Sequence, residues 1–357
     1  MADFHKLKVA EVYKETDDTS VITFEIPEEL QPLYQYHQGQ HLTLKADING
    51  EDVRRSYSLC SSPLEHQWRV AVKQIPSGKF STYVNQHLQS GEFLEVMPPS
   101  GTFGVETKPD AAKNYLFFAA GSGITPILSM IKTHLASEEN STCKLFYVNK
   151  TAKSIIFKEE LEQLRNSYFG RLEIYYFLTK ERRDIDLFNG RFDDEKMKVL
   201  TKTFIDIPDT SEVFLCGPEQ MVNFVSNYLI EAGLPKNMIH FELFVSGLSE
   251  EDIKRSERLA QQNVEGVQIT IVDGGKEFQF TMTKDYDNIL DAALNAGADL
   301  PFACKGGVCS TCKCELKEGS VEMKINYALD EKEVAQNLVL SCQAVPTSEH
   351  LVVDFDV

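Results

Sequence analysis

Hydrophobic and polar residues alternate along the first third of the chain. This alternation predicts short β-strands at residues 9–13, 20–26, 41–46 and 67–73. Proline, glycine and Asn-Gly breakers separate the strands. Strands of this length and spacing predict a small antiparallel barrel over residues 1–106.

The pattern changes after residue 107. Residues 115–120 form a continuous apolar run, which is typical of a parallel strand buried on both faces. Strand and helix patterns then alternate, at residues 127–135, 144–148, 156–166, 171–178, 212–218 and 220–232. We therefore expect an α/β module with a parallel sheet over residues 107–245.

The last third begins with a polar, charge-mixed segment at residues 246–263, which predicts a partly helical linker on which the last domain could swing. Two strand patterns follow and flank the hairpin signal Asp273-Gly274-Gly275. An amphipathic helix is expected from Asp287, as its cap, to Gly297. Residues 264–357 therefore predict an α+β domain, which makes the chain a multidomain β, α/β and α+β protein.

Four cysteines carry the clearest chemical signal. Cys304, Cys309 and Cys312 have C-x4-C-x2-C spacing, and Cys342 follows after a long gap. This is the ligand pattern of a plant-type [2Fe–2S] cluster, in a domain with the element order of a β-grasp ferredoxin. Gly306 and Gly307 would let the loop adopt positive φ and turn backbone N–H groups towards the cluster.

Two alternatives compete with the cluster. Zinc ribbons usually pair two short C-x2-C knuckles, and only one short group occurs here. Disulfides are disfavoured because no signal peptide precedes the domain. We expect Cys314 to be a packed thiol beside the cluster. Cys60, Cys143 and Cys216 lie in apolar surroundings typical of buried small hydrophobes.

Composition limits the possible partners. The 357 residues are 42% hydrophobic and carry a net charge of −18, which disfavours binding to nucleic acid or to anionic membranes. No apolar run approaches the ~20 residues of a membrane span. Without an export signal, eight cysteines indicate the reducing cytoplasm. Residues 264–357 hold 7 Lys and 16 Asp or Glu, a charge that could steer docking to a basic partner.

A second set of candidate residues lies in the barrel. Arg55, Tyr57 and Ser58 offer an anion clamp, an aromatic plate and a hydroxyl on one strand, although an exposed strand with a solvated charge would look the same. Downstream, Gly78 precedes Ser81 and Thr82, which we expect to cap a helix whose N-terminus could bind phosphate. An ordinary capped helix is the alternative.

Together these barrel motifs resemble the ferredoxin–NADP⁺ reductase family, which carries R-x-Y-[ST] followed by a G-x-x-[ST] helix start. The resemblance implies FAD, or FMN, with its isoalloxazine ring against Tyr57 and its phosphates near Arg55 and Ser81.

The α/β module carries a glycine loop after its first strand. Gly121-Ser-Gly123-Ile-Thr125-Pro126 joins a buried strand to a helix, which is a phosphate-binding arrangement, with Thr125 as a possible cap. The full G-x-G-x-x-G fingerprint is absent.

The turn Cys216-Gly217-Pro218 ends a later strand of the module, where ligands bind in open sheets. In the reductase family this turn lies beneath the nicotinamide, and the resemblance implies that Cys216 helps to set the ring for hydride transfer. By itself, Cys216 is more typical of a structural thiol. Glu242 and Phe244 could reach the junction of flavin and nicotinamide, or could belong to a plain edge strand.

Lys150 bears on the choice of nucleotide. It follows the end of a strand of the module. At this position a cationic side chain favours the 2′-phosphate of NADPH, and an acidic side chain favours the ribose of NADH. NADPH is therefore expected, with NADH possible because a lysine lacks the fork of an arginine. A solvated loop lysine is the alternative.

The order of the three modules resembles the reductase components of bacterial multicomponent oxygenases. Residues 300–313, 326–329 and 339–343 most resemble the reductase subunits of ring-1,2-phenylacetyl-CoA epoxidases. The resemblance implies that electrons pass from NAD(P)H through flavin and cluster to a di-iron oxygenase. The alternatives are a reductase for a steroid or aromatic-ring hydroxylase, a redox-sensing protein, and an interaction module with an empty cysteine loop.

Overall fold

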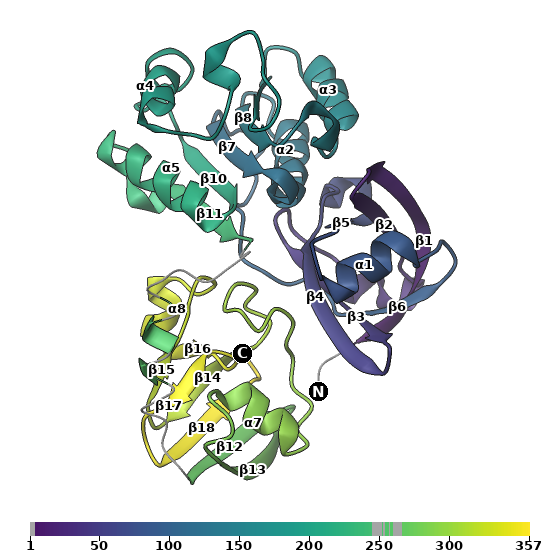
Figure 1. Cartoon of the computed structure of the whole chain (residues 1–357), viewed down its shortest axis with the longest axis vertical. Helices are drawn as coiled ribbons and strands as arrows, with labels where there is room; N and C mark the ends of the chain where they lie inside the picture. Colours follow the sequence, from purple (N-terminus) through teal and green to yellow (C-terminus); the bar gives the residue numbers. More distant parts are fainter. Residues whose placement is uncertain (1–3, 245–251, 253, 257, 260–265) are drawn as a thin grey trace. The chain divides into compact units, whose positions relative to one another are not determined.

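The computed structural model describes residues 4–244, 252, 254–256, 258–259 and 266–357 (Figure 1). The chain divides into two compact units. The larger unit contains Lys6–Val53 and Tyr57–Phe244, and the smaller one contains Val245–Val357 with Met1–His5 and Arg54–Ser56. Most of the predicted linker lies outside the described residues, and its described positions are helical.

The first part of the chain forms the predicted antiparallel barrel. Its six-stranded sheet has the order β4-β3-β6-β1-β2-β5. The interior is filled by alternating aliphatic residues, because successive side chains of a strand point to opposite faces. The elements are β1 (His5–Thr16), β2 (Thr19–Glu25), η1 (Glu28–Leu33), β3 (His41–Ile48), β4 (Glu51–Ser58), η2 (Pro63–Glu65), β5 (Trp68–Lys73), α1 (Lys79–Gln86) and β6 (Phe93–Val96).

The second part is the predicted parallel-sheet module. All its neighbouring strands are parallel, in the order β11-β10-β7-β8-β9. Helices α2 and α3 lie on one face of the sheet and α4 and α5 on the other (Figure 1). The elements are β7 (Asn114–Ala120), η3 (Gly121–Gly123), α2 (Ile124–Ser137), β8 (Thr142–Asn149), η4 (Ala152–Ser154), α3 (Lys158–Ser167), β9 (Leu172–Leu178), η5 (Asp186–Phe188), α4 (Asp194–Thr203), β10 (Glu212–Gly217), α5 (Glu219–Glu231), η6 (Lys236–Met238) and β11 (Ile239–Leu243).

Aromatic side chains fill both faces of the parallel sheet. Phe117 stacks on Phe214 at 5.5 Å between ring centroids, and Phe118 stacks on Phe146 at 4.8 Å. Since neighbouring residues of a strand face opposite sides, the run at 115–120 supplies both cores. This explains why the strand is continuously apolar and not alternating.

The smaller unit contains the predicted α+β domain. Its main sheet has the order β13-β12-β18-β14-β16, and β12 pairs in parallel with β18. Gly274 and Gly275 both have positive φ, which makes the two-residue hairpin that the sequence predicts. The elements are β12 (Val267–Asp273), β13 (Lys276–Met282), α7 (Ile289–Asn295), β14 (Lys313–Glu318), β15 (Val321–Met323), α8 (Glu331–Ala335), β16 (Leu338–Leu340), β17 (Ala344–Pro346) and β18 (His350–Asp354).

Some local predictions were wrong. Helix α7 is capped by Asn288, whose side chain accepts the N–H of Asp291, whereas Asp287 pairs with Lys324 at 2.8 Å. Strand β6 and helix α4 were not predicted. None of the described helices is both long and apolar enough to cross a membrane.

Candidate functional site

The carboxyl ends of β7 and β10 lie side by side at the centre of the parallel sheet. The chain runs from β7 outwards to β8 and β9, and then returns to β10 on the other side of β7. Such a reversal of strand order is where open α/β sheets bind their ligands. The loop of Gly121–Gly123 follows β7 at this point, and the turn at residues 216–218 ends β10.

Gly123 is required by the close approach of these two segments. A Cβ atom at Gly123 would overlap the carbonyl oxygen of Cys216. The glycine loop can therefore lie directly against the end of β10, where a dinucleotide could bridge them. Gly121, with φ +54°, makes the turn into the helix.

Helix α2 begins at this loop without a side-chain cap. Gly123 is the N-cap residue, and Thr125, which we expected to be a possible cap, lies in the first turn and donates to the carbonyl oxygen of Ser122 at 3.1 Å. Pro126 lies in the first turn, as predicted. The first N–H groups of a helix have no intrahelical partner, so this end suits a phosphate group.

Three polar side chains meet near the Cys216 turn. Ser58 Oγ, at the end of β4, donates to Glu242 Oε2 at 3.1 Å, and Cys216 Sγ lies 4.0 Å from the same oxygen. Cys216 and Glu242 are neighbours on the paired strands β10 and β11. Burial raises the pKa of the Cys216 thiol well above its usual range, and the Glu242 carboxylate raises it further. The thiol is therefore neutral at physiological pH.

Phe244 closes this group from the β11 side. Its backbone N–H donates to the carbonyl oxygen of Gly217 at 3.0 Å, which extends the strand pairing to the C-G-P turn. The structure thus brings together Ser58, Cys216, Gly217, Glu242 and Phe244. Strand β11, which carries Glu242, is an edge strand of the sheet.

The barrel places its candidates on β4 and α1. Arg55 and Tyr57 are two residues apart on β4 and therefore share a face of the strand. The Tyr57 ring packs against Phe80 of α1 at 5.8 Å between centroids. Arg55 is exposed, and its guanidinium donates to the carbonyl oxygen of Arg54 at 2.6 Å.

The predicted capping of α1 was wrong. The N-cap is Gly78, and Ser81 and Thr82 lie inside the first turn. The Ser81 hydroxyl accepts the N–H of Ile75 and donates to the carbonyl oxygen of Gly78, each at 3.3 Å. A Cβ atom at Gly78 would overlap that hydroxyl. The residues still meet at one helix N-terminus, as a phosphate site requires.

The four candidate ligand cysteines are grouped in two pairs. The thiols of Cys304 and Cys309 hydrogen-bond to each other, as do those of Cys312 and Cys342. In the part of the chain that is described, no three His, Cys, Asp or Glu side chains are arranged to hold a single metal ion. Zinc would need four ligands around one ion, whereas a [2Fe–2S] cluster takes two thiolates on each of two irons. The paired arrangement fits the cluster.

Backbone N–H groups turn towards these sulfur atoms. The Cys309 thiol, together with the N–H groups of Val308 and Gly306, lowers the pKa of Cys304 to about 6 against the effect of burial. Gly306 N lies 3.3 Å from Cys304 Sγ. These donors would stabilise thiolates bound to iron.

Only one of the two loop glycines has the predicted positive φ. Gly307 has φ +74°, and a Cβ atom there would lie 2.9 Å from the carbonyl oxygen of Ile325. Gly306 has no such φ, and instead Lys305 and Ser310 adopt φ +50°. Cys314 is buried on β14 beside the ligand loop, as predicted.

Three protein families match successive parts of the chain. Residues 6–104 match an oxidoreductase FAD-binding domain, residues 117–227 an oxidoreductase NAD-binding domain, and residues 271–347 a 2Fe-2S iron-sulfur cluster binding domain. The chain is 43% identical over 356 residues to one of the subunits of 1,2-phenylacetyl-CoA epoxidase from Escherichia coli (strain K12), covering 100% of this chain and 99% of that protein.

The chain belongs to the family of flavin- and [2Fe–2S]-containing reductases of multicomponent oxygenases. It is also 32% identical over 354 residues to the ferredoxin reductase component of 3-ketosteroid-9-alpha-monooxygenase from Rhodococcus rhodochrous, covering 98% of this chain and 96% of that protein. Phthalate dioxygenase reductase has the same fold, with a TM-score of 0.60 at 24% identity over 99% of this chain and 98% of that one. Membership of this reductase family confirms the predicted fold class and the expected FAD, NAD(P) and [2Fe–2S] domains.

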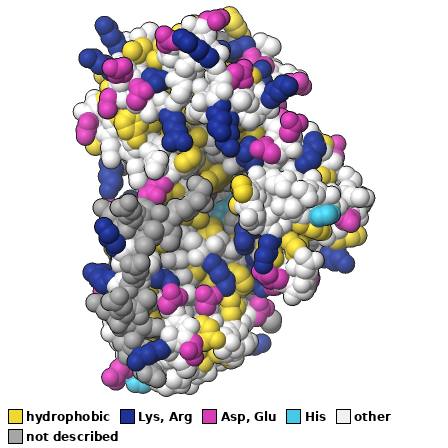
Figure 2. Space-filling model, in the orientation of Figure 1, with side chains coloured by type: hydrophobic (Ala, Val, Ile, Leu, Met, Phe, Trp, Pro, Cys, Tyr) yellow, Lys and Arg dark blue, Asp and Glu magenta, His cyan; other side chains and the backbone are white. Residues whose placement is uncertain are grey.

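The position expected to select the nucleotide lies at the end of β8 in this reductase. Lys150 is exposed directly after Asn149, the last residue of β8, and its carbonyl oxygen accepts the N–H of Lys180 at 2.8 Å. In Figure 2, Lys and Arg side chains are interspersed with Asp and Glu side chains on the face of the parallel-sheet module turned to the viewer. Lys150 lies at the end of β8, and β8 is the neighbour of β7, from which the glycine loop leaves.

Two supporting residues were missed by the sequence reasoning. Tyr147 of β8 is fully buried and donates its hydroxyl to the carbonyl oxygen of Gly121 at 2.9 Å, which holds the glycine loop. Gln343 donates to the carbonyl oxygen of Lys305 at 2.9 Å and lies 3.6 Å from Cys342 Sγ. A tyrosine in an otherwise apolar buried strand needs a hydroxyl partner, and that was the available signal.

Proposed function

We propose that this reductase passes electrons from NADPH to the di-iron oxygenase of a phenylacetyl-CoA epoxidase complex in phenylacetate catabolism. The observation that carries the proposal is the 43% identity to a 1,2-phenylacetyl-CoA epoxidase component over the whole length of both chains. When bound, FAD accepts one hydride, which carries two electrons, and releases these electrons singly, and the [2Fe–2S] cluster carries one electron at a time.

We assign FAD to the barrel. The Tyr57 ring provides the stacking surface for the isoalloxazine, and Arg55 provides a fork for the pyrophosphate. Gly78, Ser81 and Thr82 offer the N-terminal turn of α1 to a phosphate. The packing of Tyr57 on Phe80 supports this assignment because it ties the stacking surface to that turn.

We assign the nucleotide to the carboxyl ends of β7 and β10. Gly121, Gly123 and Thr125 hold its pyrophosphate at the start of α2, where a Cβ at position 123 could not be accommodated. Lys150 binds the 2′-phosphate, and its exposure at the strand end supports NADPH over NADH.

The nicotinamide ring is positioned by the end of β10, through Cys216, Gly217, Pro218 and Phe244. Cys216 acts as a neutral, buried surface for the ring, since its raised pKa excludes a thiolate at neutral pH. Ser58 and Tyr57 act on the flavin side. The bond from Ser58 to Glu242 orients the hydroxyl and excludes water from the junction.

Cys304, Cys309, Cys312 and Cys342 bind the cluster, two on each iron. Their grouping in two hydrogen-bonded pairs supports this assignment. A cytoplasmic location is proposed as well, because none of the eight cysteines, all in the described part of the chain, forms a disulfide, as is typical of a reducing compartment.

Reconstitution tests the choice of partner. The purified reductase is combined with NADPH and the oxygenase subunits of a phenylacetyl-CoA epoxidase, and epoxide formation is measured. Product coupled to NADPH oxidation is expected. The 32% identity to a 3-ketosteroid-9-alpha-monooxygenase component names the second candidate. Turnover with the steroid oxygenase alone would therefore reassign the partner.

The same preparation distinguishes a reductase from a sensor. We expect cytochrome c to be reduced by NADPH at many turnovers per second, with flavin and iron released on acid treatment. Slow or single-turnover reduction would favour a redox sensor. Absence of iron would indicate an interaction module with an empty cysteine loop.

A further inference from the structure

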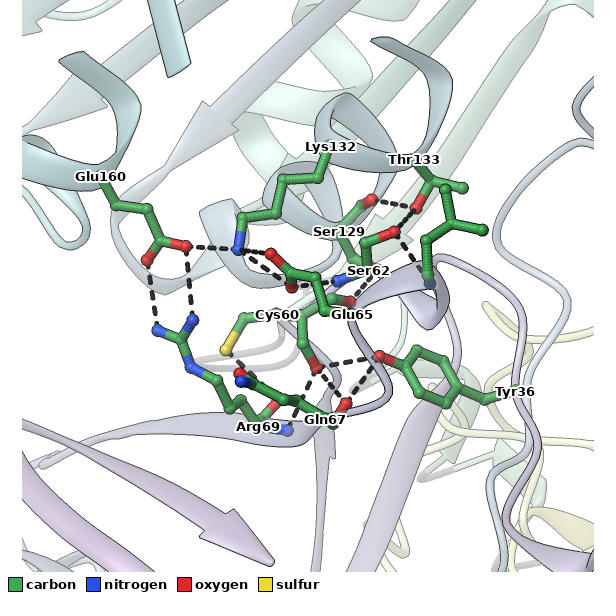
Figure 3. A network of polar contacts seen from close by, with 12 residues as sticks. Tyr36, Cys60, Ser62, Glu65, Gln67, Arg69, Ser129, Lys132, Thr133 and Glu160 are labelled. Atoms are coloured by element: carbon green, nitrogen blue, oxygen red, sulfur yellow. Dashed lines mark hydrogen bonds and ion pairs between the residues drawn. The ribbon is translucent and has the colours of Figure 1, made fainter. Parts of the chain in front are cut away.

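We propose that three side chains of α2 form a clamp that sets the distance between the flavin and nicotinamide rings. The clamp consists of Ser129, Lys132 and Thr133 of α2 bound to Ser61, Ser62 and Glu65 of the loop that follows β4 (Figure 3). This inference rests on the proposed function, because it assumes that hydride passes between the two sites.

The clamp bonds are short and specific. Ser129 Oγ donates to the carbonyl oxygen of Ser61 at 2.6 Å, and the hydroxyls of Thr133 and Ser62 hydrogen-bond at 2.8 Å. Lys132 Nζ donates to both carboxylate oxygens of Glu65, at 2.9 and 3.1 Å. The three helix residues lie on one face of α2, since Lys132 and Thr133 follow Ser129 by three and four residues.

The clamp joins the two elements that carry the reacting groups. Its loop leaves β4 at Ser58, three residues before Ser61, and its helix begins directly after Gly123, the end of the glycine loop. A helix rises about 1.5 Å per residue, so Ser129 to Thr133 lie roughly 8–14 Å along α2 from Ile124. Any shift of α2 along the barrel would therefore move the dinucleotide relative to the flavin.

The loop side of the clamp is itself fixed. Ser62 caps η2, and its backbone N–H donates to Glu65 Oε2 at 2.8 Å, so Glu65 is oriented before Lys132 reaches it. Tyr36 donates to the carbonyl oxygen of Gln67 at 2.8 Å and lies 2.9 Å from Ser61 Oγ. These bonds tie the loop to the barrel.

The helix side is extended by a chain of charged residues, of which Lys132 is buried and Arg69 and Glu160 are partly buried. Lys132, only 7% exposed, also pairs with Glu160 of α3, and Arg69 of β5 binds the same carboxylate at 3.2 and 3.3 Å. Burial would raise the pKa of Glu160, but the charges of Lys132 and Arg69 hold it below its usual range. Glu160 is therefore ionised at neutral pH and ties barrel to module.

The charged network between the barrel and the parallel-sheet module indicates that these residues position the two modules. Buried ion pairs contribute little net stability compared with apolar packing, but removal of one partner leaves the other charge buried and unpaired. Their directional bonds instead select one alignment of the two surfaces. Misplacement of reacting atoms by about 1 Å can slow a reaction about a hundredfold.

The test measures hydride transfer directly in the holoenzyme. Flavin bleaching by NADPH is followed by stopped flow in wild type and Lys132→Met, which keeps the chain length and removes the charge. We expect the limiting rate of flavin reduction to fall ten- to hundredfold, with the nucleotide Kd within about twofold of wild type. The long-wavelength charge-transfer absorbance, which requires stacked rings, should weaken as well.

Three further variants keep the test decisive. Lys113→Met is the matched control, because Lys113 pairs with Glu212 at 3.1 Å within the module and should leave the limiting rate unchanged. Lys132→Arg should restore most of the rate. Thr133→Val removes only a hydroxyl and should give a smaller loss in the same direction even if Lys132→Met is poorly folded.

The clamp and the proposed function fail in different ways. If wild type is reduced rapidly and both Lys132→Met and Thr133→Val keep its limiting rate, the clamp is wrong and the function stands. Weaker nucleotide binding, seen as a higher Kd with an unchanged limiting rate, would also overturn the clamp. If neither NADPH nor NADH reduces wild type, the proposed function is wrong, and the clamp with it.

Discussion

The hydroxyl of Ser58 donates a hydrogen bond to the carboxylate of Glu242 at 3.1 Å, although 184 residues separate them in the chain. Ser58 ends β4 of the barrel, and Glu242 lies on β11, the edge strand of the parallel sheet. The bond therefore joins the proposed flavin site to the proposed nicotinamide site. The proposed reaction site is thus formed by residues of two of the reductase's modules.

Ser58→Ala is expected to slow flavin reduction. Hydrogen bonds to charged groups contribute about 1.5–3 kcal/mol, so loss of this bond should lower the limiting rate roughly 10- to 100-fold. The nucleotide Kd should change little, because Ser58 lies on the flavin side. Stopped-flow absorbance at several NADPH concentrations separates the two quantities.

A second barrel serine provides the control for Ser58→Ala. Ser90 Oγ accepts the backbone N–H of Val12 at 2.8 Å, so Ser90→Ala removes a comparable bond outside the proposed site. Its limiting rate should match wild type. Equal losses in both variants would show that barrel stability, and not the Ser58 hydroxyl, governs the rate.

The elements that hold the site were predictable because their signals are local. A buried strand running into Gly121 and Gly123, and the spacing of the cysteines, each follow from a few consecutive residues. The helix caps were not predictable. The hydroxyls of Ser81 and Thr125 can bond to nearby backbone groups from the first turn of a helix as well as from its N-cap position. A short range of sequence does not distinguish these positions.

The contacts that assemble the site could not be predicted in this way. Glu242 meets Ser58, and Lys132 meets Glu65, only after separate modules have folded and packed. No periodicity encodes such pairs. Buried charge was the available signal, since an ionised side chain in an apolar helix such as α2 requires a partner.

Cys309→Ser should separate the two halves of the reductase. Loss of one thiolate removes the cluster, so reduction of cytochrome c should fall at least tenfold while NADPH still bleaches the flavin. Absorbance, iron content and both rates are measured on one preparation. Simultaneous loss of both activities would contradict the modular division of labour.

Cys314→Ala is the matched control for Cys309→Ser. Burial raises the pKa of the Cys314 thiol above its usual range, and its Sγ contacts the carbonyl oxygen of Val339 at 3.8 Å. It is therefore a packed neutral thiol. The variant should keep the iron and the cluster spectrum, with a loss of stability only.

Gln343→Leu should lower the reduction potential of the cluster. The side chain is 4% exposed, and its Nε2 lies 3.6 Å from Cys342 Sγ, where an N–H donor stabilises the added negative charge. A hydrogen bond contributes about 0.5–1.5 kcal/mol, or roughly 20–60 mV for one electron. A redox titration followed by electron paramagnetic resonance measures the shift.

Gln268→Leu distinguishes this local effect from a general one. Gln268 Nε2 donates to Thr281 Oγ1 at 2.9 Å on the β12–β13 hairpin. The potential should remain at the wild-type value in this variant. An unchanged potential in Gln343→Leu, with iron retained, would exclude a tuning role for Gln343.

Lys150→Ala should impair NADPH more than NADH. The lysine is exposed, so its charge should contribute roughly a five- to tenfold lower KM for the nucleotide that carries the 2′-phosphate. The KM for NADH should stay within twofold. Lys153→Ala, three residues on, is the control, and equal effects on both nucleotides would remove the basis for NADPH.

His41 should make the barrel sensitive to acid. Burial lowers its pKa to about 4, from a usual value near 6.5. Between these two pH values His41 binds a proton in the unfolded chain but not in the folded barrel. The stability present above pH 6.5 is therefore lost as the pH falls towards 4. The difference corresponds to about 3 kcal/mol.

His41→Gln isolates this contribution. Glutamine can still bond the Ser100 hydroxyl, which lies 3.2 Å from His41 Nε2, but it does not titrate. Trp68, the single tryptophan of the chain, lies on β5 and reports barrel unfolding by fluorescence. The free energy of unfolding of wild type minus variant should decrease between pH 7 and 4. A constant difference would show that His41 is protonated, or already exposed, in the folded barrel.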